Sequence, residues 1–141
     1  MKRSKTFRCV PPKFVVLVLL LAVSTFPATS FARDDVFHRG AEYEKATLDE
    51  FRLVPDLKAF CWTNWTYAKE VPAGNDTLYG EERFYIVDVG RRVLALVYRN
   101  YLGELHPVGG KVLGIEWKRP AAGSPEEALM RRIEGLFSQA G

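Results

Sequence analysis

The segment VDVGRRVLA constrains the fold more than any other stretch, because it joins two strands through a turn short enough to fix their register. β-branched and aromatic residues fill positions 82–89 and 92–101 on either side of Gly90-Arg91, which is typical of strands. Gly90 can supply the positive φ that a two-residue type II′ turn needs at its first central position. Counting outward from this turn gives the register Val89–Arg92, Val87–Leu94, Tyr85–Leu96 and Arg83–Tyr98.

Both faces of the predicted hairpin are apolar, whereas an antiparallel sheet with one wet face alternates apolar and polar residues. One face presents Tyr85, Val87, Leu94, Leu96 and Tyr98. The other presents Phe84, Ile86, Val93, Ala95 and Val97. A single helix can cover only one of them. The second face needs the chain's own residues 36–57, a partner surface or a ligand, and the sequence leaves these three open. Ala95 is small enough to form the floor of a groove or to let a helix approach.

Two more strands are predicted at about 60–70 and 111–118, which makes a four-stranded antiparallel meander. Residues 102–110 form a long connection rich in glycine before the last strand.

The C-terminal segment SPEEALMRRIEGLFSQAG predicts an amphipathic helix. Ser124 is placed as the N-cap, Pro125 as the first helical residue, and Glu127 completes a capping box. Apolar residues recur at steps of three and four from Leu129 to Ala140, so this stripe should pack on one sheet face.

Residues 33–46 are mostly charged and predict a flexible arm before a single small domain, residues 47–141. Thr47 and Glu50 have the spacing of a capping box, and Pro55 would end the helix that they begin. The predicted fold class is therefore α+β: a short N-terminal helix, a four-stranded antiparallel meander, and a C-terminal helix packed on one face.

Residues 1–32 have the layout of a secretory signal peptide, with a basic start, an apolar run from Phe14 to Val23 and small residues at Ser30 and Ala32. The run is too short for a spanning helix of about 20 residues. We therefore expect an exported protein, periplasmic or extracellular, whose contact with a membrane is transient unless the signal stays uncleaved.

Cleavage would change the charge balance. Five of the 20 basic residues and none of the 17 acidic residues lie in 1–32, so the mature chain has 15 basic against 17 acidic residues. A net charge of −2 argues against nucleic-acid binding.

The stretch AFCWTNWTYAKEV raises the choice between an ordinary core strand and an aromatic stripe that meets a ligand. Core packing is the preferred interpretation, with Trp65 and Tyr67 the residues most suited to reach a ligand. Cys61, the only cysteine after residue 32, is interpreted as buried, with an intermolecular disulfide as the alternative.

No catalytic, metal or cofactor motif is recognised. His106 could act as a base, alone with carboxylates or paired with Cys61, but nothing in the sequence brings these groups together. Cysteines and histidines are too few and scattered for a structural zinc site. Basic residues near strand ends, Arg83 and Arg99 among them, could meet anionic headgroups, although solvated strand ends are the preferred interpretation.

The leading functional hypothesis is a small exported, non-catalytic module that binds a partner protein or an apolar or amphipathic ligand through a sheet face and the 102–110 connection. A self-associating envelope protein, for example a homodimer, and a small hydrolase using His106 are the alternatives. The candidate contact residues are Trp65, Tyr67, Ala95, Arg99, Tyr101 and His106.

Overall fold

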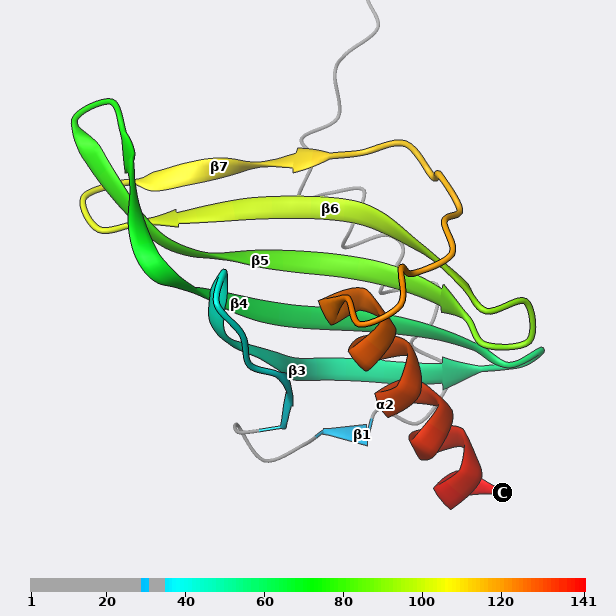
Figure 1. The fold of residues 1–141 in the computed structure, drawn as a ribbon. Coiled ribbons are helices and arrows are strands. Elements are labelled where there is room, and N and C mark those ends of the chain that lie inside the picture. The colour runs from blue at the N-terminus through cyan, green and yellow to red at the C-terminus, as the bar shows by residue number, and fades with distance from the viewer. Residues whose placement is uncertain (1–28, 31–34) are drawn as a thin grey trace, which may run out of the picture.

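The computed structural model describes residues 29–30 and 35–141, which form a seven-stranded antiparallel sheet and a C-terminal helix on one of its faces (Figure 1). The predicted leader, residues 1–32, lies outside the described residues except for Thr29–Ser30. The strands are β1 (Thr29–Ser30), β2 (Val36–His38), β3 (Tyr43–Val54), β4 (Lys58–Ala73), β5 (Asp76–Asp88), β6 (Val93–Gly103) and β7 (Pro107–Val112). Their order is β1-β3-β4-β5-β6-β7, with β2 also paired to β3.

The α+β class and the antiparallel sheet are confirmed, but the sheet has seven strands rather than the predicted four, and the predicted N-terminal helix at Thr47 is wrong. Residues 43–54 form β3, which pairs along its length with β4. The register shifts between Leu48 and Glu50, and this bulge leaves Leu48 and Phe51 in the same buried cluster. Thr47 and Glu50, whose spacing resembles a capping box, therefore pair with Asn64 and Trp62 in the sheet and cap no helix.

Part of the segment interpreted as an arm also lies in strands, since it includes β2 and the start of β3. The Asp35 carboxylate accepts hydrogen bonds from Arg132 Nε and Nη2, both at 2.9 Å. This ion pair fastens the segment before β2 to the C-terminal helix.

The β5–β6 hairpin has the predicted register near its turn, with Val87 opposite Leu94 and Tyr85 opposite Leu96. The turn itself is wider than predicted. Asp88 pairs with Val93, and Arg92, rather than Gly90, adopts a positive φ of 53°.

A register shift farther along the hairpin changes which residues face each other. It falls between Phe84 and Tyr85, so that Phe84 faces Tyr98 and Arg83 faces Arg99. The predicted pairing of Arg83 with Tyr98 is therefore wrong by one residue, and two arginines lie directly opposite each other.

The C-terminal helix α2 (Pro125–Ala140) is confirmed, with Ser124 as its N-cap. Ser124 Oγ accepts a hydrogen bond of 3.2 Å from the Glu127 N–H. Within 29–30 and 35–141, no helix combines the length and apolar character needed to cross a membrane.

Buried apolar residues form two clusters, as expected for a hairpin with two apolar faces. The first, on the α2 side, comprises Tyr43, Ala46, Leu48, Phe51, Ala59, Cys61, Trp65, Tyr85, Val87, Leu94, Leu129, Met130, Ile133 and Leu136. The second comprises Phe84, Ile86, Ala95, Val97 and Tyr98, with Phe60, Trp62 and Val112 packed against it.

The strand predicted at 111–118 is only partly present. β7 ends at Val112, and the chain rejoins β6 through a bridge between Lys118 and Leu94. We call the detached residues Gly114–Trp117 the lip. Ile115 and Trp117 in the lip are 59% and 36% exposed.

The connection predicted at 102–110 is short, because β6 extends to Gly103 and β7 begins at Pro107. The Asp76 carboxylate accepts backbone hydrogen bonds from Leu105 (3.0 Å) and His106 (3.2 Å). These bonds tie the turn at 104–106 to the start of β5.

Candidate functional site

The candidate site is built on a row of polar side chains along β5. Glu81, Arg83 and Tyr85 alternate on this strand and therefore point to the same face. Tyr85 belongs to the cluster that includes α2, so the row points toward the helix side of the sheet. The three residues are 2%, 4% and 1% exposed. Charged residues are rarely buried to this extent unless they are paired.

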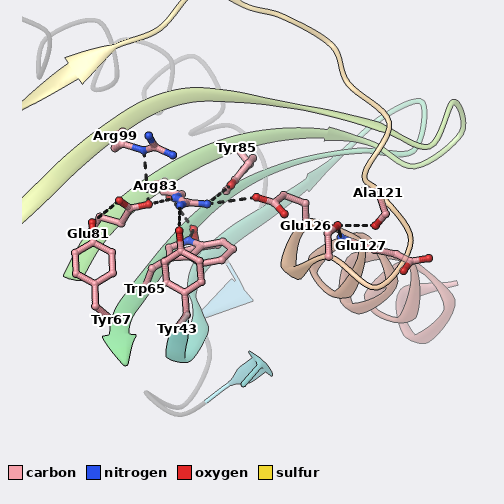
Figure 2. A network of polar contacts seen from close by, with 12 residues as sticks. Tyr43, Trp65, Tyr67, Glu81, Arg83, Tyr85, Arg99, Ala121, Glu126 and Glu127 are labelled. Carbon is pink, nitrogen blue, oxygen red and sulfur yellow. Dashed lines mark hydrogen bonds and ion pairs between the residues drawn. The ribbon is translucent and has the colours of Figure 1, made fainter. Parts of the chain in front are cut away.

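Arg83 is at the centre of a network that engages its whole guanidinium (Figure 2). Nη2 donates to the Tyr43 hydroxyl at 2.8 Å, and Nη1 donates to the Tyr85 hydroxyl at 3.0 Å. Nε donates to Glu81 Oε1, and the guanidinium carbon lies 4.0 Å from the centre of the Trp65 ring.

A contact to the helix completes the surroundings of Arg83. Glu126 Oε1, in the first turn of α2, lies 3.4 Å from Arg83 Nη1. Partners from β3, β4, β5 and α2 thus converge on one side chain, which makes it a structural tie between these elements.

Burial would by itself lower the pKa of Arg83, but the neighbouring Tyr85 and Glu81 outweigh this effect and raise it. Burial raises the pKa of Tyr85 to about 12. Burial and the hydrogen bond to Glu81 likewise raise the pKa of Tyr67. At neutral pH the network therefore contains a charged arginine and neutral tyrosines.

Glu81 is shared among three partners. Its Oε2 accepts a hydrogen bond of 2.7 Å from the Tyr67 hydroxyl, and its Oε1 accepts from Arg83. The same Oε1 lies 3.6 Å from Arg99 Nε, which is an ion-pair contact but too long for a hydrogen bond.

Arg99 lies beside this network but is less completely engaged. Its side chain is 31% exposed, and Nη1 donates to the Tyr101 hydroxyl at 3.3 Å. Its Nε is buried and has no hydrogen-bond acceptor among the described residues. Arg99 is thus a partly exposed cation, and it lies beside Arg83, whose guanidinium is buried and engaged by protein partners.

A cavity of about 590 Å³, which we call the main cavity, opens along β6 beside Arg99. Its volume is within the range usual for small-molecule sites. It is bordered by β5 and β6, the lip, the segment that follows the lip, and the start of α2, and it is open to solvent. The lining residues are Arg83, Tyr85, Leu94, Leu96, Arg99, Leu113, Gly114, Ile115, Glu116, Lys118, Arg119, Pro120, Ala121, Ser124 and Glu126.

A second cavity of about 440 Å³ also has Arg83 and Arg99 in its wall. Tyr67 and Tyr101 line it as well. The two arginines therefore separate two hollows on the α2 side of the sheet.

The sequence-predicted contact residues fall into two groups. Tyr67, Arg99 and Tyr101 come together around the second cavity, and Trp65 is buried beneath Arg83. Ala95 is fully buried in the cluster on the opposite face, and His106 lies in the exposed turn at 104–106. Neither lines the main cavity.

The sequence interpretation missed Glu81, Arg83, Tyr43, Tyr85 and the lip. Treating Arg83 as a solvated strand end was wrong, since it is buried. The strand alternation could have revealed this row. Extending the predicted strand to residue 81 places Glu81, Arg83 and Tyr85 on one face.

Cys61 is fully buried, and burial raises the pKa of its thiol, which keeps it protonated and unreactive. A disulfide between two copies would require Cys61 to become exposed from the cluster that includes α2. Across 29–30 and 35–141, no group of three or more His, Cys, Asp or Glu residues is arranged to hold a metal ion.

Comparison with protein-family models gives no match. Curated proteins and solved structures likewise include none that matches this chain.

Proposed function

We propose that the protein is a small exported, non-catalytic module that binds an apolar or amphipathic ligand in the main cavity. The observation that carries this proposal is the cavity itself, a hollow of about 590 Å³ whose lining combines apolar side chains with charged ones. Such a combination is what small-molecule sites usually present.

The apolar part of the cavity comes from two strands and the lip. Leu94 and Leu96 project from β6, while Leu113 and Ile115 approach from the other side. Burying a ligand's hydrocarbon against these side chains would stabilise the complex by about 25 cal/mol for each Å² removed from water.

This site differs from the sequence prediction in both of its elements. The prediction used the sheet face of Ala95, which the helix does not cover, and the 102–110 connection, whereas the main cavity lies on the α2 side and is bordered by the lip. The turn at 104–106 is held in place by Asp76, whereas the lip is joined to β6 only on either side, at Leu113 and Lys118. The lip is therefore the better candidate for the wall that a ligand contacts.

A substitution in the lip tests the cavity without disturbing the core. A Cβ at Gly114 would meet no atom within 4 Å, so Gly114→Trp should fold and fill the cavity. Gly109→Trp is the matched control, because Gly109 has the same free space but does not line the cavity.

The probe is N-phenyl-1-naphthylamine, a neutral dye that fluoresces in apolar surroundings. We expect wild type and Gly109→Trp to bind it with equal dissociation constants, and Gly114→Trp to bind at least tenfold more weakly with an unchanged melting temperature. Equal binding by all three proteins would exclude the main cavity as the site. No binding to wild type would refute the proposed function.

Native mass spectrometry of protein purified gently from the exported fraction tests export and cargo together. A monomer with the mass of residues 33–141 and a removable adduct is the expected result. A bare dimer would support self-association instead.

A further inference from the structure

Arg99 has an unusual position for a cation that is partly open to solvent. It lies directly opposite Arg83 in the β5–β6 register, and it lines both the main and the second cavity. Like charges directly opposite each other destabilise a sheet. One carboxylate, Glu81, lies close to both arginines.

The donors of Arg99 are incompletely used. An arginine side chain has five N–H donors and no acceptor. Here Nη1 has one long hydrogen bond to Tyr101, and Nε is buried without an acceptor within hydrogen-bond distance among the described residues. Both oxygens of Glu81 are already engaged by Tyr67 and Arg83. The residues that the structure describes therefore leave Arg99 short of acceptors.

The charges around the main cavity also favour an anionic ligand. Its lining includes four basic residues, Arg83, Arg99, Lys118 and Arg119, and two acidic residues, Glu116 and Glu126. Each of these acids already pairs with a base, Glu116 with Lys118 at 3.6 Å and Glu126 with Arg83 at 3.4 Å. An anion placed at Arg99 would neutralise part of the excess.

The apolar floor adjoins Arg99 along the same strand. Leu94 and Leu96 precede it on β6, and all three residues line the main cavity. We infer that the ligand is an anionic amphiphile, a single hydrocarbon chain that lies against these leucines and ends in an oxyanion bound by the Arg99 guanidinium. This inference rests on the proposed function and specifies the chemical class of its ligand.

An arginine suits such a head group better than a lysine would. Its planar guanidinium presents parallel N–H donors that match the two oxygens of a carboxylate or phosphate. Charge-assisted hydrogen bonds of this kind are about twice as strong as neutral ones.

The test compares ligands that share a chain and differ in the head group. Dodecanoate, dodecyl phosphate and dodecan-1-ol are titrated into the exported protein by isothermal calorimetry, with acetate and inorganic phosphate as heads without a chain. We expect both charged amphiphiles to bind at least tenfold more tightly than the alcohol, and the short anions to bind at least a hundredfold more weakly. The tighter of the two amphiphiles identifies the head group.

Variants of Arg99 assign the effect to one side chain. Arg99→Gln should lose at least tenfold in dodecanoate affinity, keep its affinity for dodecan-1-ol and keep its melting temperature. Arg99→Lys, which retains the charge without the fork, should be intermediate. Arg131→Gln is the matched control, because Arg131 is 70% exposed on α2 and does not line the main cavity.

Several outcomes would overturn the inference. One such outcome is that wild type binds dodecanoate and dodecan-1-ol with equal affinity while Gly114→Trp binds neither. That result would refute the anionic head group and leave the proposed function intact. Short anions that bind as tightly as dodecanoate would indicate a site for a free anion. Binding of neither long-chain ligand to wild type would refute the inference and the proposed function together.

Discussion

Replacement of Glu81 by glutamine should destabilise the protein strongly, because it removes the one carboxylate that both β5–β6 arginines approach. Glutamine keeps the shape of the side chain and an acceptor for Tyr67, so the change is mainly electrostatic. Loss of one partner from a buried ion pair costs about 3–5 kcal/mol. Arg83 would keep its contacts to two tyrosines and to the partly exposed Glu126, so we expect a cost of about 3 kcal/mol, the lower end of that range.

Urea unfolding followed by tryptophan fluorescence measures this cost. With a slope of about 1.5 kcal/mol per M, the midpoint should fall by about 2 M. Glu116→Gln is the control, since Glu116 is 77% exposed and its pair with Lys118 should contribute less than about 1 kcal/mol.

A double variant separates charge from packing. Glu81→Gln combined with Arg83→Met removes both buried charges and should recover part of the lost stability, which gives a coupling free energy of about 1–3 kcal/mol. Additive effects of the two changes, or a single variant within about 0.5 kcal/mol of wild type, would contradict the reasoning.

Three further changes have defined outcomes. Gly80→Ala should lower the urea midpoint, with an expected cost of about 1–3 kcal/mol, because its Cβ would clash with the Trp65 carbonyl oxygen, which the β4 backbone holds in place. Iodoacetamide at pH 8 should leave Cys61 unmodified in the folded protein and alkylate it in urea, since burial raises the pKa of this thiol; rapid modification of the folded state would contradict that. Backbone hydrogen bonds, that of Leu105 foremost, lower the pKa of the Asp76 carboxyl in the folded protein from about 3.8. The ionised carboxylate therefore stabilises the fold fully above about pH 3.8, and this stabilisation is lost as the pH falls through the lower pKa of the folded state. The Leu105 amide resonance should therefore shift only below about pH 4, and Asp76→Asn should abolish this shift.

The parts of the fold that the sequence predicted correctly depend on local chemistry. The β5–β6 register near the turn follows from strand periodicity, and the start of α2 follows from Ser124 and Pro125. The helix predicted at Thr47 failed because the capping-box residues Thr47 and Glu50 lie inside β3, which forms a hairpin with β4 and pairs with it along its length.

The site was predicted only in part for a related reason. The sequence analysis named Tyr67 for its aromatic stretch and Arg99 for its place near a strand end, and it also named Tyr101. These three residues do come together around the second cavity. Arg83 was misjudged because the predicted strand began at residue 82, whereas β5 begins at Asp76 and lies between β4 and β6. A charged residue at the end of a short strand is solvated, but the same residue in the middle of a long central strand is buried.

Arg83 and Arg99 face each other on neighbouring strands, yet the structure gives them different roles. Arg83 is saturated by partners from four elements, so Arg83→Gln should lower the free energy of unfolding. Arg99 has few protein partners and repels Arg83, and relief of a like-charge pair across a sheet contributes about 0.2–1 kcal/mol. In the ligand-free protein, Arg99→Gln should therefore leave the free energy of unfolding unchanged or raise it by up to about 1 kcal/mol. A purely structural arginine would show the opposite sign, so a clear loss of stability in Arg99→Gln would place Arg99 with Arg83 in the framework and not in the site.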